Sequence, residues 1–246
     1  MIEPGVVPYL LGGISALMVG LSKTGLPGFS MLFVPLMAQV FDAKLSVGAT
    51  LGLLLVGDVF AVRKYRQHTQ WKHLWGLFPF VAAGMIPAYG LLRFIEGPQL
   101  RVGLGALVLA LLGLEVWRRQ AQWTRFPHTA WFAAMTGFLA GFSTTMGNVA
   151  GPVMSVFLIS RGLPKNEFMG TSAWFFFLVN LSKVPFYAGY TGMITAGTLW
   201  FNLWMAPVVA AGAVVGIWLL PRIPQKIFDA SVLGLSALAA LKLVFS

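Results

Sequence analysis

The residues best suited to chemistry lie in two polar stretches, 20–28 and 142–152, that interrupt otherwise apolar sequence. Both combine hydroxyl or amide side chains with helix-breaking glycine and proline, and the first also carries a lysine. Such groups, together with the free N–H groups of helices that restart after a break, favour binding of an anion. The candidate anion-binding residues are Ser22, Lys23, Thr24, Gly25, Gly28, Ser143, Thr144, Thr145, Gly147, Asn148 and Gly151.

Ionisable residues inside apolar segments are a second kind of candidate, because they usually mark the pathway of a substrate or a proton. Asp58 is a candidate site for a coupling proton, the alternative being a residue near the inner interface that pairs with basic neighbours. Asn180 is a further candidate for a coupling role, because it occupies the position that corresponds to Asp58 at an offset of 122 residues. Lys183 either meets substrate or extends its ammonium group outward. Lys23 likewise either binds the anion or anchors its segment at the cytoplasmic surface.

Enzyme chemistry is not supported by the residues present. A serine protease needs a histidine base beside its nucleophile, but His68, His73 and His128 all fall in or beside loops. No histidine pair has metalloprotease spacing, no glycine-rich phosphate loop is present, and the chain has no cysteine. We therefore expect no catalytic residue, no metal ligand and no cofactor.

Composition indicates a polytopic membrane protein with a single membrane domain. The 246 residues are 58% hydrophobic and only 10% charged, against roughly 25% charged in soluble domains. The net charge of +10 arises from clusters between apolar runs rather than along one face. The positive charge therefore indicates how the segments are oriented in the bilayer and does not indicate a nucleic-acid partner.

The elements that must position these residues are ten hydrophobic segments, all expected to be helical. They cover residues 5–22, 29–41, 45–62, 74–95, 100–117, 129–146, 149–160, 167–188, 197–220 and 226–245. The second and seventh are too short to span comfortably, so short or re-entrant helices are expected after the glycine and proline breaks. Full spans and re-entrant hairpins both remain open there. The aromatic run 174–177 is interpreted as packing and lipid-facing bulk.

The two halves show a repeat at an offset of 122 residues. This offset places Gly25 on Gly147, Gly48 on Gly170 and Asp58 on Asn180. The predicted repeats are 1–121 and 122–246, with about five segments each. The basic cluster at 63–72 corresponds to the uncharged stretch 188–197. Because Lys and Arg concentrate on the cytoplasmic side, the two repeats are predicted to be inverted. An eight-span arrangement would remove the excess of Lys and Arg on one side of the membrane.

The same motifs resemble the sulfite exporter TauE/SafE family, also called the toluene-sulfonate uptake permeases. The resemblance runs through residues 20–28, 34–36, 48–50, 147–152, 170–176 and 180–185, and so covers both halves. It implies a multi-pass transporter of small sulfur-containing or organic anions in the bacterial inner membrane. Many members carry an all-glycine run where this chain has 24–28, which leaves the exact substrate open.

The expected function is therefore a secondary transporter that moves a small anion such as sulfite or an organosulfonate by alternating access. The expected partners are that anion, protons as coupling ion and the lipid bilayer. An anion-selective channel or a uniporter with the same site is the alternative. Direction of transport and oligomeric state stay open.

Overall fold

The structure is a computed structural model. It describes residues 6–25, 33–37, 39–41, 43–91 and 129–245, and the single positions 106, 109, 110 and 113. Over these residues the chain forms helices and turns without a β-strand. The helices are α1 (Val6–Thr24), α2 (Phe33–Met37), α3 (Ala43–Tyr65), η2 (Arg66–His68), α4 (Trp71–Trp75), α5 (Phe78–Leu91), α7 (Ala130–Gly147), α8 (Gly151–Ser160), α9 (Lys165–Pro185), η4 (Phe186–Tyr190), α10 (Ala196–Leu219), η5 (Leu220–Arg222) and α11 (Gln225–Phe245). The expected all-α fold is confirmed.

Most predicted segments coincide with helices to within a few residues, such as 45–62 with α3 and 197–220 with α10. The predicted segment 74–95 differs, because residues 74–75 belong to α4 and residues 78–91 form α5, while 92–95 lie outside the described residues. Pro79 lies in the first turn of α5, where its missing N–H costs no helical hydrogen bond. Segment 100–117 lies outside the described residues except for the single positions above, so the count of ten stays a prediction.

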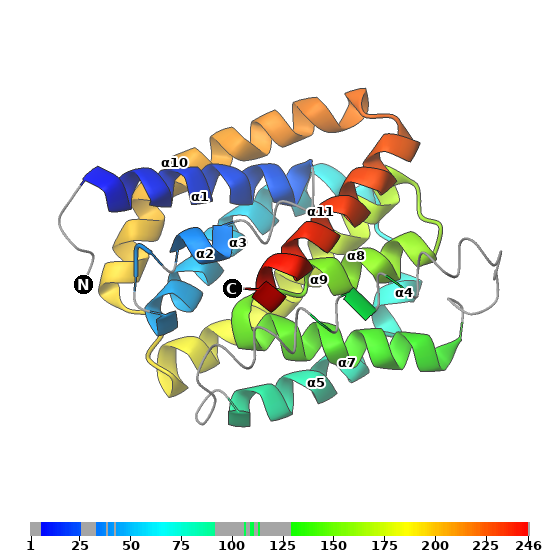
Figure 1. The fold of residues 1–246 in the computed structure, drawn as a ribbon, viewed down its shortest axis with the longest axis horizontal. Helices are drawn as coiled ribbons and strands as arrows, with labels where there is room; N and C mark the ends of the chain where they lie inside the picture. The colour runs from blue at the N-terminus through cyan, green and yellow to red at the C-terminus, as the bar shows by residue number, and fades with distance from the viewer. Residues whose placement is uncertain are drawn as a thin grey trace.

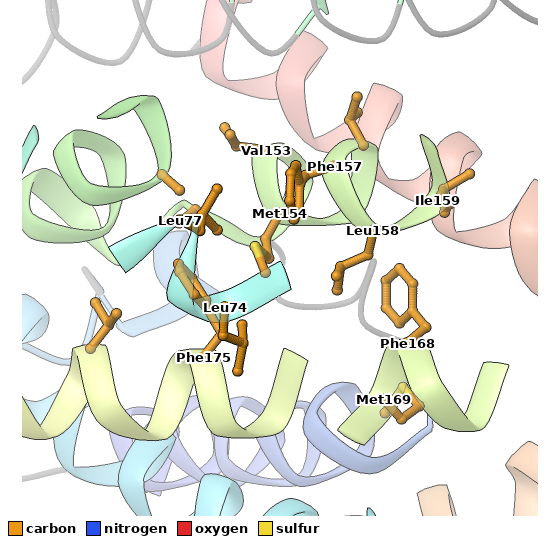
Figure 2. Close-up of a cluster of buried hydrophobic side chains, with 14 of the residues drawn as sticks. Leu74, Leu77, Val153, Met154, Phe157, Leu158, Ile159, Phe168, Met169 and Phe175 are labelled. Carbon is orange, nitrogen blue, oxygen red and sulfur yellow. The ribbon is translucent and has the colours of Figure 1, made fainter. Parts of the chain in front are cut away.

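The helix after the second break is short, as expected. α8 has ten residues, which at 1.5 Å per residue makes it about 15 Å long, half the thickness of a hydrocarbon core. All ten of its residues are buried. Figure 2 shows its side chains Val153, Met154, Phe157 and Leu158 packed against Leu74, Leu77 and residues of α9. The protein interior thus surrounds α8 and the break that precedes it.

Two pairs of packed helices form opposite sides of the molecule: α1 lies against α10, and α5 lies against α7 (Figure 1). α3 and α9 pack on each other between them. Glycines allow the close approach. A Cβ on Gly212 would lie 2.1 Å from the Leu17 carbonyl oxygen, and one on Gly84 would lie 2.0 Å from that of Phe138. Each pair joins a helix of the first half of the chain to one of the second half.

Two described stretches, Leu45–His68 and Ala196–Arg222, are long and apolar enough to cross a membrane by themselves. The second belongs largely to α10, which exposes a row of large apolar side chains. They are Leu199, Trp200, Leu203, Trp204, Val214, Val215 and Trp218. Exposed apolar surface of this extent, rich in tryptophan, is typical of a helix that faces lipid.

Candidate functional site

The second predicted break has the backbone geometry that an interruption between two helices requires. α7 ends at Gly147, and Asn148 follows in the left-handed region at φ 58° and ψ 27°. Asparagine is, after glycine, one of the residues that tolerates this conformation best. α8 then begins at Gly151 with Pro152 in its first turn, a position that favours proline. At the first break α1 ends at Thr24, and Gly28 lies outside the described residues.

Lys23, Asp58 and Asn180 meet where α1, α3 and α9 come together. The Lys23 ammonium nitrogen lies 2.6 Å from Asp58 Oδ1. The Asn180 amide Nδ2 donates to the other carboxylate oxygen, Oδ2, at 2.7 Å. Asp58 is fully buried, and the Lys23 side chain is only 9% exposed. Lys23 therefore lies inside the protein with a specific partner, and the basic residue that pairs with Asp58 is Lys23.

Lys183 is the second buried ammonium group, and it is bound to neutral acceptors. It donates to the Thr144 carbonyl oxygen at 3.2 Å, to Thr144 Oγ1 at 3.0 Å and to Asn148 Oδ1 at 2.6 Å. Asn148 in turn donates from Nδ2 to the Val47 carbonyl oxygen of α3 at 3.1 Å. Lys183 is fully buried, so its ammonium group does not extend to the surface. It joins the end of α7 to α9.

A cavity lies beside these groups. Six residues expected from sequence line it: Ser22, Lys23, Thr144, Asn148, Gly151 and Asn180. These six come from both predicted halves of the chain, and from both sides of the second break. The cavity thus brings together polar groups that are far apart in sequence, among which Lys23 carries the charge.

Other candidate residues turn away from the cavity. Thr24 Oγ1 donates to the carbonyl oxygens of Gly20 and Ala213, which ties α1 to α10. The hydroxyls of Ser143 and Thr145 bond carbonyl oxygens one turn back in α7, an ordinary use of hydroxyl groups within helices. Gly25 packs on α10, since a Cβ there would lie 2.8 Å from Gly216 Cα. Gly147 ends α7 and does not line the cavity.

The rest of the lining was not among the candidate site residues. It consists of Phe33, Leu54, Met169, Ser172, Ala173 and Phe176. The Phe176 ring centroid lies 4.3 Å from Lys23 Nζ, within the range of a cation–π contact. Phe176 packs against the buried core cluster, as expected for residues 174–177, and it also lines the cavity. The available signal was helical spacing, because Met169, Ala173, Phe176, Asn180 and Lys183 follow one face of α9 at intervals of four and three.

Comparison with known families decides which class of protein has this arrangement. The family model of the sulfite exporter TauE/SafE family matches residues 12–243, nearly the whole chain. The chain belongs to this family. The TauE/SafE family is one of membrane transporters, so the chain is a multi-pass membrane protein of a transport family. No curated protein and no solved structure matches it.

Proposed function

We propose that the protein is a secondary transporter that carries a small anion through the cavity at Lys23 by alternating access, coupled to protons. The observation that carries this proposal is the charge of the site. Two ammonium groups, Lys23 and Lys183, are buried beside one carboxylate, Asp58. A buried charge is costly unless an opposite charge accompanies it. A bound anion would supply the charge that the site lacks.

The chemistry of the lining supports a sulfonate-like or carboxylate-like anion. Ser22, Ser172 and Thr144 contribute hydroxyl groups to the cavity, and Lys23 contributes an ammonium group. These groups donate hydrogen bonds to oxygen atoms without requiring a metal. Phe33, Leu54 and Met169 provide apolar wall on which the remainder of an organic anion could pack. Sulfite and organosulfonates are the substrates we propose first.

We propose further that the chain consists of two inverted repeats, 1–121 and 122–246. The helix pairs support a two-fold relationship. Adding 122 to α1 (6–24) gives 128–146, which overlaps α7 (130–147), and adding 122 to α5 (78–91) gives 200–213, which lies within α10. The contact of α1 with α10 is thus the counterpart of the contact of α7 with α5. Reciprocal contacts of this kind are typical of a two-fold axis.

Two tyrosines add to that support. Tyr65 and Tyr187 are 122 positions apart. The Tyr65 hydroxyl donates to the Thr24 carbonyl oxygen at 2.7 Å, and that of Tyr187 donates to the Thr145 carbonyl oxygen at 2.6 Å. Each therefore holds the last turn of the helix before a break. The contrast between basic residues 63–72 and uncharged residues 188–197 favours inversion over a parallel arrangement.

Asp58 is the residue we propose for proton coupling. It is the buried carboxylate of the described residues, and its two oxygens face a lysine and an amide. Protonation of Asp58 would change the charge beside Lys23, so the binding of a proton and the binding of an anion would each alter the other. Such linkage between an anion and a proton is reciprocal by thermodynamic necessity. The proposed location is the bacterial inner membrane.

Transport by the purified protein in lipid vesicles tests the proposal. The panel is sulfite, sulfoacetate, taurine and simple carboxylates, each with and without a proton gradient. We expect at least one anion to accumulate above its equilibrium level when the gradient is imposed. Movement that only follows the anion's own gradient would favour a channel or uniporter, and absence of movement for every anion would refute the proposed substrate class.

A further inference from the structure

The buried site contains an unequal number of positive and negative groups. Among the described residues, the charged side chains in and beside the cavity are Lys23, Asp58 and Lys183. Other charged side chains of the long helices lie near helix ends, such as Arg63 and Lys64 at the end of α3, both exposed. Their fields reach the cavity only weakly because solvent and salt screen them.

The two lysines differ in how their charge is balanced. Lys23 lies 2.6 Å from Asp58, so this pair has no net charge. Lys183 has three oxygen neighbours within 3.2 Å, which match the three hydrogens of an ammonium group. These oxygens belong to Thr144 and Asn148, and neither residue is charged. With both lysines protonated and Asp58 ionised, the site as a whole carries one surplus positive charge.

From this balance we infer that Asp58 determines the charge of the transported anion, and that the site selects anions with a single negative charge. The inference rests on the proposed function, since it concerns the same cavity. While Asp58 is ionised, one monoanion neutralises the three groups together. A dianion would leave an uncompensated negative charge in a buried site, which is strongly unfavourable.

Substitutions at Asp58 and Asn180 can separate the effect of the Asp58 charge from the effect of its shape. Asn180 Nδ2 lies 2.7 Å from Asp58 Oδ2, so the two side chains occupy neighbouring places beside the cavity. Asp58→Asn raises the net charge of the site from +1 to +2 with almost no change in volume. Asp58→Asn combined with Asn180→Asp returns the net charge to +1 and moves the carboxylate by one hydrogen-bond length.

Methanesulfonate and sulfate are suitable probes, because both are tetrahedral and of similar size. They differ by a methyl group in place of an oxygen, and at neutral pH they carry one and two negative charges. We measure their dissociation constants for the purified full-length protein by isothermal titration calorimetry. Asp229→Asn serves as the matched control, because Asp229 bonds Gln225 on α11 and does not line the cavity.

We expect the unmodified protein and the Asp229→Asn variant to prefer methanesulfonate by about tenfold or more. Asp58→Asn should shift the ratio toward sulfate by about tenfold or more, and the double variant should restore it. An unchanged ratio in Asp58→Asn, or a folded double variant that still favours sulfate, would overturn the inference while leaving the proposed function standing. If the unmodified protein binds neither anion, the inference fails, whereas the proposed function stands or falls on the vesicle assays.

Discussion

Asn180 donates a hydrogen bond to Asp58 across 2.7 Å, and the two residues are 122 positions apart in the chain. They lie on α9 and α3, the two long helices that pack on each other in the interior. An amide and a carboxylate have the same shape, but only the carboxylate can bind a proton. Under the proposed repeat, the first half of the chain carries a titratable group at this position and the second half carries its neutral counterpart.

The first prediction follows from that difference. Asp58→Asn should preserve exchange of substrate down its own gradient and weaken accumulation driven by a proton gradient, because the site keeps its shape and loses the group that binds the proton. Vesicle assays of exchange and of gradient-driven uptake, made on one preparation, compare the two activities directly. Gradient-driven transport equal to that of the unmodified protein would contradict the proposed coupling role.

The second prediction concerns inversion and uses the absence of cysteine from the chain. Single cysteines at Gln67 and Gly189 occupy positions 122 residues apart, both exposed, and a Cβ at Gly189 meets no atom within 4 Å. If the repeats are inverted, a membrane-impermeant maleimide should label the two cysteines from opposite sides. Labelling of both cysteines from the same side would contradict inversion and favour the parallel, eight-span arrangement.

The helices and the second break could be predicted from sequence because their causes are local. Apolar runs interrupted by glycine, proline and charge define segments, and Gly147, Asn148 and Pro152 together end one helix and start the next. The division between α4 and α5 was missed. Trp71, Leu74, Trp75 and Phe78 continue an apolar pattern, so only Gly76 and Pro79 marked the turn.

The site could be predicted only in part, since a hydroxyl group in a helix has two possible roles. Thr144 lines the cavity, whereas Ser143 and Thr145 bond the preceding turn of the same helix. Sequence spacing alone does not say which of three adjacent residues faces a neighbour across the interior. The partner of Lys23 was also missed, because the contact with Asp58 depends on how α1 packs against α3.

The third prediction concerns the packing of α1 on α10. Gly212→Ala should lower stability by about 1–3 kcal/mol, because the added methyl group would lie 2.1 Å from the Leu17 carbonyl oxygen and force the helices apart. Gly13→Ala is the matched control, since a Cβ there meets no atom within 4 Å. Thermal unfolding in detergent should show a lower midpoint for the first variant alone. Equal midpoints for both would mean that the close approach is not required.

The last prediction concerns the anion site itself. Lys23→Ala should weaken anion binding by about ten- to a hundredfold, since loss of a charge-assisted hydrogen bond to a buried anion costs roughly 1.5–3 kcal/mol. Asn148→Ala should weaken binding to a similar degree, because Lys183 loses its acceptor at 2.6 Å and α7 loses its bond to Val47. Lys64→Ala on the exposed end of α3 is the control and should bind normally.

Lys23→Ala should also destabilise the fold, by about 3–5 kcal/mol, because it leaves Asp58 buried without its cation. The double variant Lys23→Ala with Asp58→Asn separates the two effects. Its thermal stability should recover toward that of the unmodified protein, since no unpaired carboxylate remains, while its affinity for the anion should stay low. Calorimetric titration and thermal unfolding of the same samples provide both readouts. If anion affinity recovers together with stability, Lys23 acts on the fold alone, and the anion must be held elsewhere.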